Sequence, residues 1–107
     1  MLKKICKLSD LSEGKGKKFF IDDEDVAIFL IKGKVFALSN ICPHQHSSII
    51  HEGFLEDDFV VCPAHGWKFN IHNGKKEGKY NGLKSYSVMV ENGEVFIEMK
   101  KNTYKYE

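Results

Sequence analysis

The chain has 107 residues, of which 42% are hydrophobic, and this size suits one compact domain with one ordinary core. The formal net charge is +1, and all sixteen basic residues are lysines. Without arginine the chain lacks the side chain best suited to phosphate and guanine, which argues against a nucleic-acid partner. No segment has the length and apolar character of a membrane span or a signal peptide. We therefore expect a single domain over residues 1–107 in the cytoplasm.

Apolar runs separated by turn residues predict a succession of short strands, starting at the amino terminus. The alternating segment "KKICKL" predicts a strand in which Cys6 is a small, half-buried residue rather than a ligand. The following "LSDLSE" has the length of one helical turn. Next, "VAIFLIKGKVFALSN" predicts a hairpin around 32–34, and "GFLEDDFVVC" predicts another around 56–58. The acidic stretches "DDED" (22–25) and "EDD" (56–58) are expected to be solvated turns.

The carboxyl-terminal half continues the same pattern. "WKFNIHNGKK" predicts a strand that runs into an Asn-Gly turn, and "SYSVMVENGEVFIEM" predicts a hairpin around Asn92-Gly93, which favours a type I′ turn. The last residues, "KKNTYKYE", are expected to form a fraying polar tail. About eight short strands with frequent turns predict an all-β fold, an antiparallel β-sandwich or barrel.

One segment concentrates the residues that bind metals. Residues 42–67, "CPHQHSSIIHEGFLEDDFVVCPAHGW", contain two of the three cysteines, four of the five histidines and both prolines. The pattern is C-x-H, then seventeen residues, then C-x-x-H. Each half follows an expected strand, so the two halves are expected to be loops at strand ends that the chain between them brings together. Two thiolates and two imidazoles suit either a tetrahedral zinc ion or a binuclear iron–sulfur cluster.

The two half-motifs, "CPHQHSSIIHEG" and "CPAHGWKFNIHNGK", resemble those of the Rieske iron–sulfur family. The downstream "GLKSYSVMVENGEVFIEM" extends the resemblance, which covers roughly residues 30 to 99. It implies a cluster-binding subdomain of two loops over about residues 40–72, carrying one [2Fe-2S] cluster per chain. By position in the motif, Cys42 and Cys62 would hold the inner iron, and His44 and His65 the outer iron near the surface. Structural zinc remains the alternative.

Several neighbours of these four residues are expected to support the loops. Proline fixes φ near −65°, so Pro43 and Pro63 are expected to stiffen the two loops. Gly53 and Gly66 permit a close backbone approach or a sharp turn. Trp67 is expected to pack beneath the second loop, in a supporting role.

The remaining histidines and two isoleucines leave alternatives open. His46 lies two residues beyond His44 and is the alternative ligand to it. His51 and His72 are expected to lie on the surface. Ile49 and Ile50 are either core residues under the first loop or part of an apolar collar around exposed imidazoles.

The resemblance also implies a potential and a role. High-potential Rieske proteins carry an extra cysteine in each loop and a serine after the His-Gly pair; here Trp67 occupies that position and the extra cysteines are missing. This departure predicts the lower part of the Rieske range. Rieske oxygenases continue into a mononuclear iron domain, for which this chain has no room. The expected function is one-electron transfer from a flavin reductase to an oxygenase or other redox partner, rather than catalysis. The alternatives are the small subunit of a larger reductase, such as nitrite reductase, and a zinc-stabilised binding module.

Overall fold

The computed structural model describes residues 2–42, 47–64, 66–76 and 82–99, which form strands and two short 3₁₀ helices. The strands are β1 (Leu2–Lys7), β2 (Gly16–Ile21), β3 (Glu24–Ile31), β4 (Lys34–Ser39), β5 (Phe54–Glu56), β6 (Phe59–Val61), β7 (Lys68–Asn70), β8 (Ser85–Tyr86), β9 (Val88–Glu91) and β10 (Glu94–Glu98). The helices are η1 (Leu8–Asp10) and η2 (Ile50–Glu52). None of the helical segments in these residues has the length and apolar character for a membrane span.

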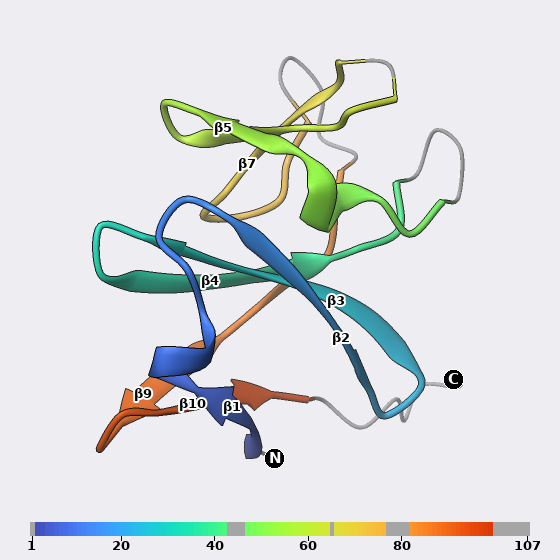
Figure 1. The fold of residues 1–107 in the computed structure, drawn as a ribbon. Coiled ribbons are helices and arrows are strands. Elements are labelled where there is room, and N and C mark those ends of the chain that lie inside the picture. Colours follow the sequence, from blue (N-terminus) through green and yellow to red (C-terminus); the bar gives the residue numbers. More distant parts are fainter. Residues whose placement is uncertain (1, 43–46, 65, 77–81, 100–107) are drawn as a thin grey trace.

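The strands form three sheets, which lie one above another in Figure 1. The lowest sheet has the order β1-β10-β9, the central one β2-β3-β4-β8, and the uppermost β5-β6-β7. Neighbouring strands are antiparallel in each sheet. The predicted all-β, antiparallel class is therefore confirmed. The tail from residue 100 onward lies outside the described residues.

The turns lie where the sequence predicted them. Lys32 and Gly33 have φ of 51° and 79°, and Asn92 and Gly93 have φ of 53° and 76°. Positive φ at both central residues is typical of a type I′ turn, whose twist matches that of the flanking strands. The assignment of two residues to turns was wrong, because Lys34 is the first residue of β4 and Glu56 is the last residue of β5.

The continuous apolar run in β3 is explained by a core on each face of the central sheet. Successive residues of a strand point to opposite faces, so Ala27 and Phe29 enter the upper core while Val26 and Ile28 enter the lower one. Their side chains are completely buried. The upper core also contains the residues that carry the candidate metal centre, so the central sheet forms its floor.

Tyr86 on β8 connects the edge of the central sheet to the first residue of β3. Its hydroxyl donates a hydrogen bond to the carboxylate of Glu24 on β3, and Lys84 Nζ lies 3.2 Å from Glu24 Oε1. Burial raises the pKa of Tyr86 above its ordinary value of 10.0, and the hydrogen bond to Glu24 and its negative charge raise it further. The stabilisation associated with this raised pKa is complete below about pH 10 and is lost as the pH rises through the folded-state pKa.

Phenylalanine at this position tests that assignment. Tyr86→Phe removes a hydrogen bond to a charged acceptor, so we expect the free energy of unfolding to fall by about 1–2 kcal/mol at neutral pH. Above pH 10 the tyrosine of the unfolded wild type ionises, so the wild type loses its extra stability. The free energies of unfolding of the two proteins should then converge. Urea unfolding of both proteins at pH 7 and pH 11 measures the difference. A difference that stays constant with pH would contradict the assignment.

Candidate metal centre

Two buried cysteines meet between the central and the upper sheet. Cys42 follows β4 and Cys62 follows β6; each is 1% exposed, and their Sγ atoms lie 3.5 Å apart. A disulfide would bring the sulfurs to about 2.05 Å. Two thiolates on one tetrahedral metal ion, with metal–sulfur bonds of about 2.3 Å, lie about 3.8 Å apart. The observed separation therefore suits two thiolates that share one metal ion.

The two cysteine loops are built alike. The backbone N–H of Cys42 donates to the carbonyl of Ser47 at 2.9 Å, and that of Cys62 donates to the carbonyl of Trp67 at 2.8 Å. In each loop the acceptor comes five residues after the cysteine, so the same bond closes both. An isolated antiparallel bridge between Ile41 and Ser48 continues the closure of the first loop. Each cysteine therefore lies at the start of a loop that a backbone hydrogen bond closes.

Gly66, Gly53 and Trp67 were predicted to support the site, and each has a backbone or packing role in the structure. Gly66 has φ of 75°, a conformation that residues with a Cβ rarely adopt, and its N–H donates to the carbonyl of Cys62 at 3.0 Å. Gly53 lies so close to the carbonyl of Val61 that a Cβ would collide with it. Trp67 packs against the upper core, with its ring centroid 6.4 Å from that of Phe69.

The structure describes the cysteines of the predicted ligand set. His44 and His65 lie outside the described residues, as do Pro43 and the alternative ligand His46. Among the residues that are described, no group of three or more His, Cys, Asp or Glu side chains is close enough to hold a metal ion. The described part of the centre is thus its cysteine half, and the four-residue ligand set stays a prediction.

The isoleucines next to the first loop are core residues. Ile50 is completely buried in the same core cluster as the two cysteines, and Ile49 packs against that cluster. The prediction for His72 is also confirmed, because its side chain is 57% exposed. The burial of the two isoleucines follows from η2, which contacts β2 and β3 of the central sheet.

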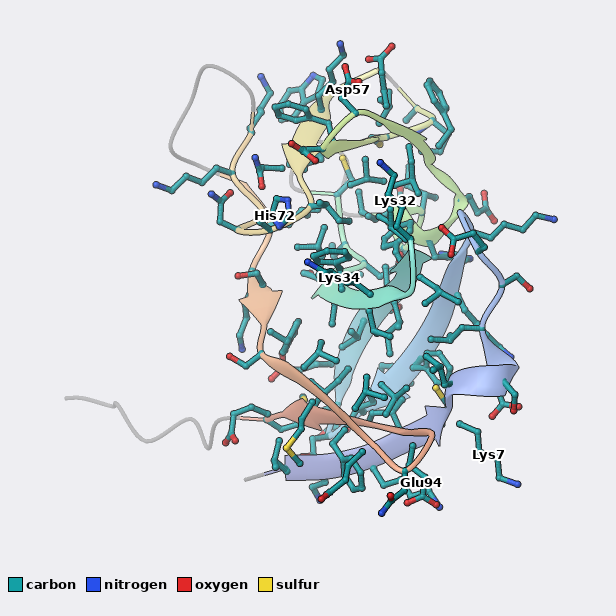
Figure 2. The ribbon with its side chains drawn as sticks, turned by 90° about the vertical axis from the view of Figure 1, so that its left-hand side faces the viewer. Lys7, Lys32, Lys34, Asp57, His72 and Glu94 are labelled. Atoms are coloured by element: carbon teal, nitrogen blue, oxygen red, sulfur yellow. The ribbon has the colours of Figure 1, made fainter. Side chains whose placement is uncertain are left out.

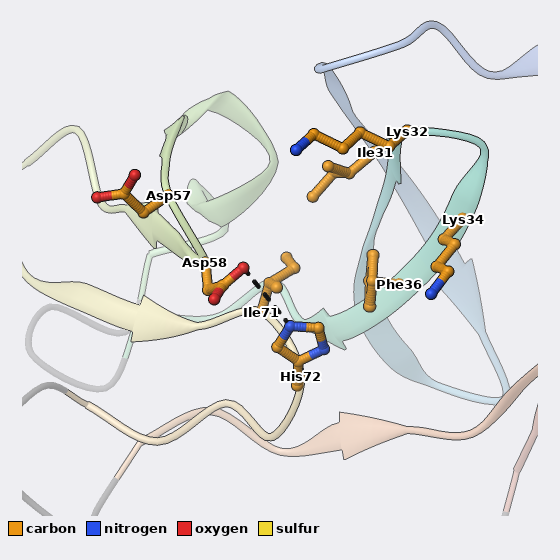
Figure 3. A pocket seen from close by; sticks show the side chains of 8 residues that line it. All are labelled: Ile31, Lys32, Lys34, Phe36, Asp57, Asp58, Ile71 and His72. Carbon is orange, nitrogen blue, oxygen red and sulfur yellow. Dashed lines mark ion pairs between the residues drawn. The ribbon is translucent and has the colours of Figure 1, made fainter.

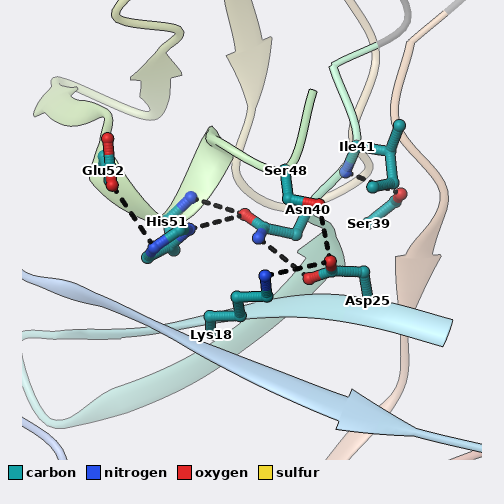
Figure 4. A network of polar contacts seen from close by, with 8 residues as sticks. All are labelled: Lys18, Asp25, Ser39, Asn40, Ile41, Ser48, His51 and Glu52. Carbon is teal, nitrogen blue, oxygen red and sulfur yellow. Dashed lines mark hydrogen bonds and ion pairs between the residues drawn. The ribbon is translucent and has the colours of Figure 1, made fainter. Parts of the chain in front are cut away.

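The prediction for His51 was wrong, because its side chain is only 21% exposed and enters a polar network (Figure 4). Its backbone N–H donates to Asn40 Oδ1 at 2.6 Å, and its Nδ1 lies 3.1 Å from the same oxygen. Asn40 is completely buried and lies two residues before Cys42. A polar residue at the end of an apolar strand, just before a ligand motif, was the available sequence signal.

Asp25 is the centre of this network and was wrongly assigned to a solvated turn. Its Oδ1 accepts a hydrogen bond from Asn40 Nδ2 at 2.9 Å, and its Oδ2 accepts one from Ser48 Oγ at 2.6 Å. Lys18 Nζ lies 3.5 Å from Oδ2. Burial by itself would raise the pKa of Asp25, but the hydrogen bonds from Ser48 and Asn40 and the charge of Lys18 together lower it below its ordinary value.

A separate pocket of about 180 Å³ lies between the β3–β4 turn and the β5–β6 turn (Figures 2 and 3). It is lined by Ile31, Lys32, Lys34, Phe36, Asp57, Asp58, Ile71 and His72. The ring of His72 meets that of Phe36 edge-on at 5.2 Å, and His72 Nε2 lies 3.7 Å from Asp58 Oδ1. The two cysteines follow the far ends of β4 and β6, so the pocket is not part of the metal centre. Its contacts join the upper sheet to the central one.

An antiparallel β-fold that buries two free thiols 3.5 Å apart offers two cysteine ligands to one metal ion, so the class of protein that it suits is a small metal-binding protein. The comparisons identify the family within this class. A model of the Rieske-like [2Fe-2S] domain matches residues 2–98, so the chain belongs to the Rieske-like [2Fe-2S] family and binds one such cluster. The cysteine pair fits this group, whose inner iron takes two thiolates.

Curated relatives and solved structures agree with this assignment. The ferredoxin component of the alkene monooxygenase system of Xanthobacter autotrophicus is 32% identical over 94 residues, covering 87% of this chain and 77% of that protein. The 3-phenylpropionate/cinnamic acid dioxygenase ferredoxin subunit of Shigella flexneri is 36% identical over 98 residues, covering 88% and 90%. A crystal structure described as a nitrite reductase NADPH small subunit is 25% identical with a TM-score of 0.86, covering 92% and 99%. The chain is thus similar to electron-transfer components.

Proposed function

We propose that this protein is a ferredoxin that accepts one electron from a flavin reductase and passes it to an oxygenase. In this proposal Cys42 and Cys62 hold the inner iron, and His44 and His65 hold the outer iron. The observation that carries it is the buried cysteine pair, 3.5 Å apart, in a chain that matches the Rieske-like family. The acceptor is suggested by the relatives, which are ferredoxin components of monooxygenase and dioxygenase systems.

The chain's own residues contribute a rigid, dry half-site. When bound, a [2Fe-2S] cluster stores and releases one electron. The side chains of Cys42 and Cys62 are buried in the upper core, which excludes water from the sulfur atoms. The backbone N–H of each cysteine is held by a hydrogen bond, and a ligand that moves little loses little energy to reorganisation when the charge of the site changes. This arrangement of the two cysteines suits electron transfer.

Metal analysis and electron paramagnetic resonance test the proposal directly. We expect purified protein to contain two irons and two acid-labile sulfides per chain, and the dithionite-reduced form to give the spectrum of a binuclear cluster with imidazole ligands. A colourless protein with one zinc and no sulfide would instead support the zinc-stabilised binding module. A binuclear cluster without nitrogen hyperfine coupling would refute the histidine ligands alone.

The reduction potential is expected to lie in the lower part of the Rieske range. That range extends from roughly −150 to +300 mV, and hydrogen bonds to the cluster sulfurs raise the potential. Trp67 occupies the position at which high-potential members have a serine, and an indole ring has no hydroxyl to donate there. A redox titration followed by visible absorption measures the midpoint. A value well above about +100 mV would contradict this expectation, since it belongs to the upper part of the same range.

A second candidate is a small electron-transfer subunit of a larger reductase, favoured by the structural likeness to a nitrite reductase small subunit. Affinity purification from the native organism separates the two roles. A free ferredoxin elutes as a coloured monomer, whereas a subunit elutes with a large flavin or haem protein. In both roles the chain transfers electrons and does not transform a substrate by itself.

The proposal includes one domain over residues 1–107, with a cluster-binding part at about 40–72. It also includes a cytoplasmic location, which cell fractionation tests.

A further inference from the structure

The side chain of Asp25 on β3 forms hydrogen bonds with residues at both ends of the first cysteine loop (Figure 4). Asp25 accepts a hydrogen bond from Asn40 Nδ2, which precedes the loop, and another from Ser48 Oγ, which follows it. The two distances are 2.9 Å and 2.6 Å. Because each carboxylate oxygen has its own donor, the two ends of the loop are held at a separation set by a rigid, planar group.

The chemistry of the donors fixes the orientation of every member of the network. An ionised carboxylate only accepts hydrogen bonds, so the amide NH₂ of Asn40 must face Asp25. Asn40 Oδ1 then faces His51, which donates to it from the backbone N–H at 2.6 Å and from Nδ1 at 3.1 Å. The neutral form of His51 therefore carries its proton on Nδ1.

The backbone of Asn40 is tied into the same unit. Its N–H donates to the carbonyl of Asp25 at 2.9 Å, and its carbonyl accepts from the N–H groups of Ile49 and Ile50 at 3.1 Å and 3.3 Å. The bridge between Ile41 and Ser48 follows directly, and then the bond from Cys42 to Ser47. A continuous series of hydrogen bonds thus connects Asp25 to the backbone of Cys42.

The carboxylate of Asp25 is largely buried and accepts a hydrogen bond from a donor that solvent does not reach. The Asp25 side chain is 11% exposed, whereas Lys18, its charged neighbour, is 46% exposed. Removing the carboxylate would leave the completely buried amide of Asn40 with an unpaired donor, which is unfavourable because water cannot replace the lost partner. The backbone bonds between the two ends of the loop would remain, but the side chains of Asn40 and Ser48 would lose the carboxylate that they share.

We propose that Asp25 is a positioning residue of the metal centre. By holding Asn40 and Ser48 together it sets the position of the Cys42 thiolate, and so governs both the retention of the bound group and its reduction potential. This inference rests on the proposed function, because it takes Cys42 to be a ligand. Its carboxylate also places a negative charge beneath the loop, which disfavours the more negative, reduced state of the centre.

The test compares Asp25→Ala and Asp25→Asn with the control Asp22→Asn. Asp22 lies three residues earlier in the β2–β3 turn, its side chain is 48% exposed, and its φ of 49° suits asparagine, so the control removes the same charge without touching the network. The readouts are the rate of iron release to a chelator, the reduction potential and the g values of the reduced protein. Unfolding of the iron-free proteins measures any purely structural effect.

Asp25→Ala is expected to release iron about tenfold or more faster than the wild type, because groups that orient metal ligands contribute about 10–100-fold to affinity. Asp25→Asn keeps the bond from Asn40, so it should release iron more slowly than Asp25→Ala. Both Asp25 variants should have a higher reduction potential than Asp22→Asn. The charge of Asp22 is exposed and screened by solvent, so its removal should change the potential little.

Release rates, potentials and g values equal to those of Asp22→Asn would overturn the role of Asp25. If Asp25→Ala does not fold, Ser48→Ala removes a single donor, and unchanged release and g values in that variant would overturn the role as well. A wild type without iron and sulfide would refute the proposed function, and this role with it; an iron-loaded wild type with inert Asp25 variants refutes this role alone.

Discussion

Serine in place of Cys42 is expected to give a folded, colourless protein that holds neither iron nor acid-labile sulfide. The thiol is 1% exposed and lies 3.5 Å from that of Cys62, so no other described cysteine can take its place. Serine is nearly isosteric but its hydroxyl is a poor ligand for iron in a sulfide-bridged cluster. Visible absorption and iron and sulfide assays measure the loss, and circular dichroism checks the fold.

Cys6→Ser is the matched control. Cys6 is on β1, packs against the lower core, and its half-buried thiol has a pKa raised by burial and then by the charge of Asp10. We expect this variant to keep its full content of iron and sulfide. A Cys42→Ser protein that retained the wild-type spectrum would disprove the ligand assignment.

The histidines allow the same comparison. His44→Ala should abolish the imidazole-type resonance of the reduced protein, whereas His46→Ala should preserve it.

The second large effect is expected from Phe69→Ala in the upper core. Phe69 is on β7 opposite Val60, is completely buried, and belongs to the core cluster that contains Cys42 and Cys62. Truncating a buried phenylalanine leaves a cavity and costs about 3–5 kcal/mol, a large share of the stability of a small domain. We expect partial unfolding at 37 °C and loss of the bound cluster. Thermal unfolding and iron retention measure the two effects.

Phe54→Ala provides the control for this change. Phe54 is on β5 of the same three-stranded sheet, but its side chain is 59% exposed. Removing an exposed side chain should change the free energy of unfolding by no more than about 0.5 kcal/mol. Equal destabilisation by both substitutions would show that the upper sheet is not stabilised by the core described above.

The local features of the fold could be predicted because each depends on a few adjacent residues. Asn92-Gly93 and Lys32-Gly33 form the expected turns, since these pairs accept positive φ. The run Val26 to Ile31 is a strand, and its lack of alternation reflects the burial of both faces. By contrast, β2 and η2 were not predicted. β2 carries lysines and phenylalanines in adjacent pairs, a pattern without a regular period.

The change of sheet near the carboxyl terminus could not be predicted either. "SYSVMV" alternates like one strand, but Tyr86 pairs with β4 in the central sheet while Val88 pairs with β10 in the lower sheet. Val90 is 43% exposed despite its favourable position in the pattern. Periodicity indicates which side of a strand is apolar; it carries no information about which strand lies beside it.

The sequence by itself determined the class of fold and the turns, because these follow from short-range backbone preferences, and the resemblance of its two Cys-Pro motifs to the Rieske family indicated the type of metal centre. Only the tertiary structure decided that Asp25, Asn40 and His51 form one buried network beneath the first loop. Asp25 and Asn40 are fifteen residues apart and meet because β3 and β4 pair in one register. A carboxylate in an acidic turn and a carboxylate that orients a metal loop have the same local sequence, and they differ only in the neighbours that folding supplies.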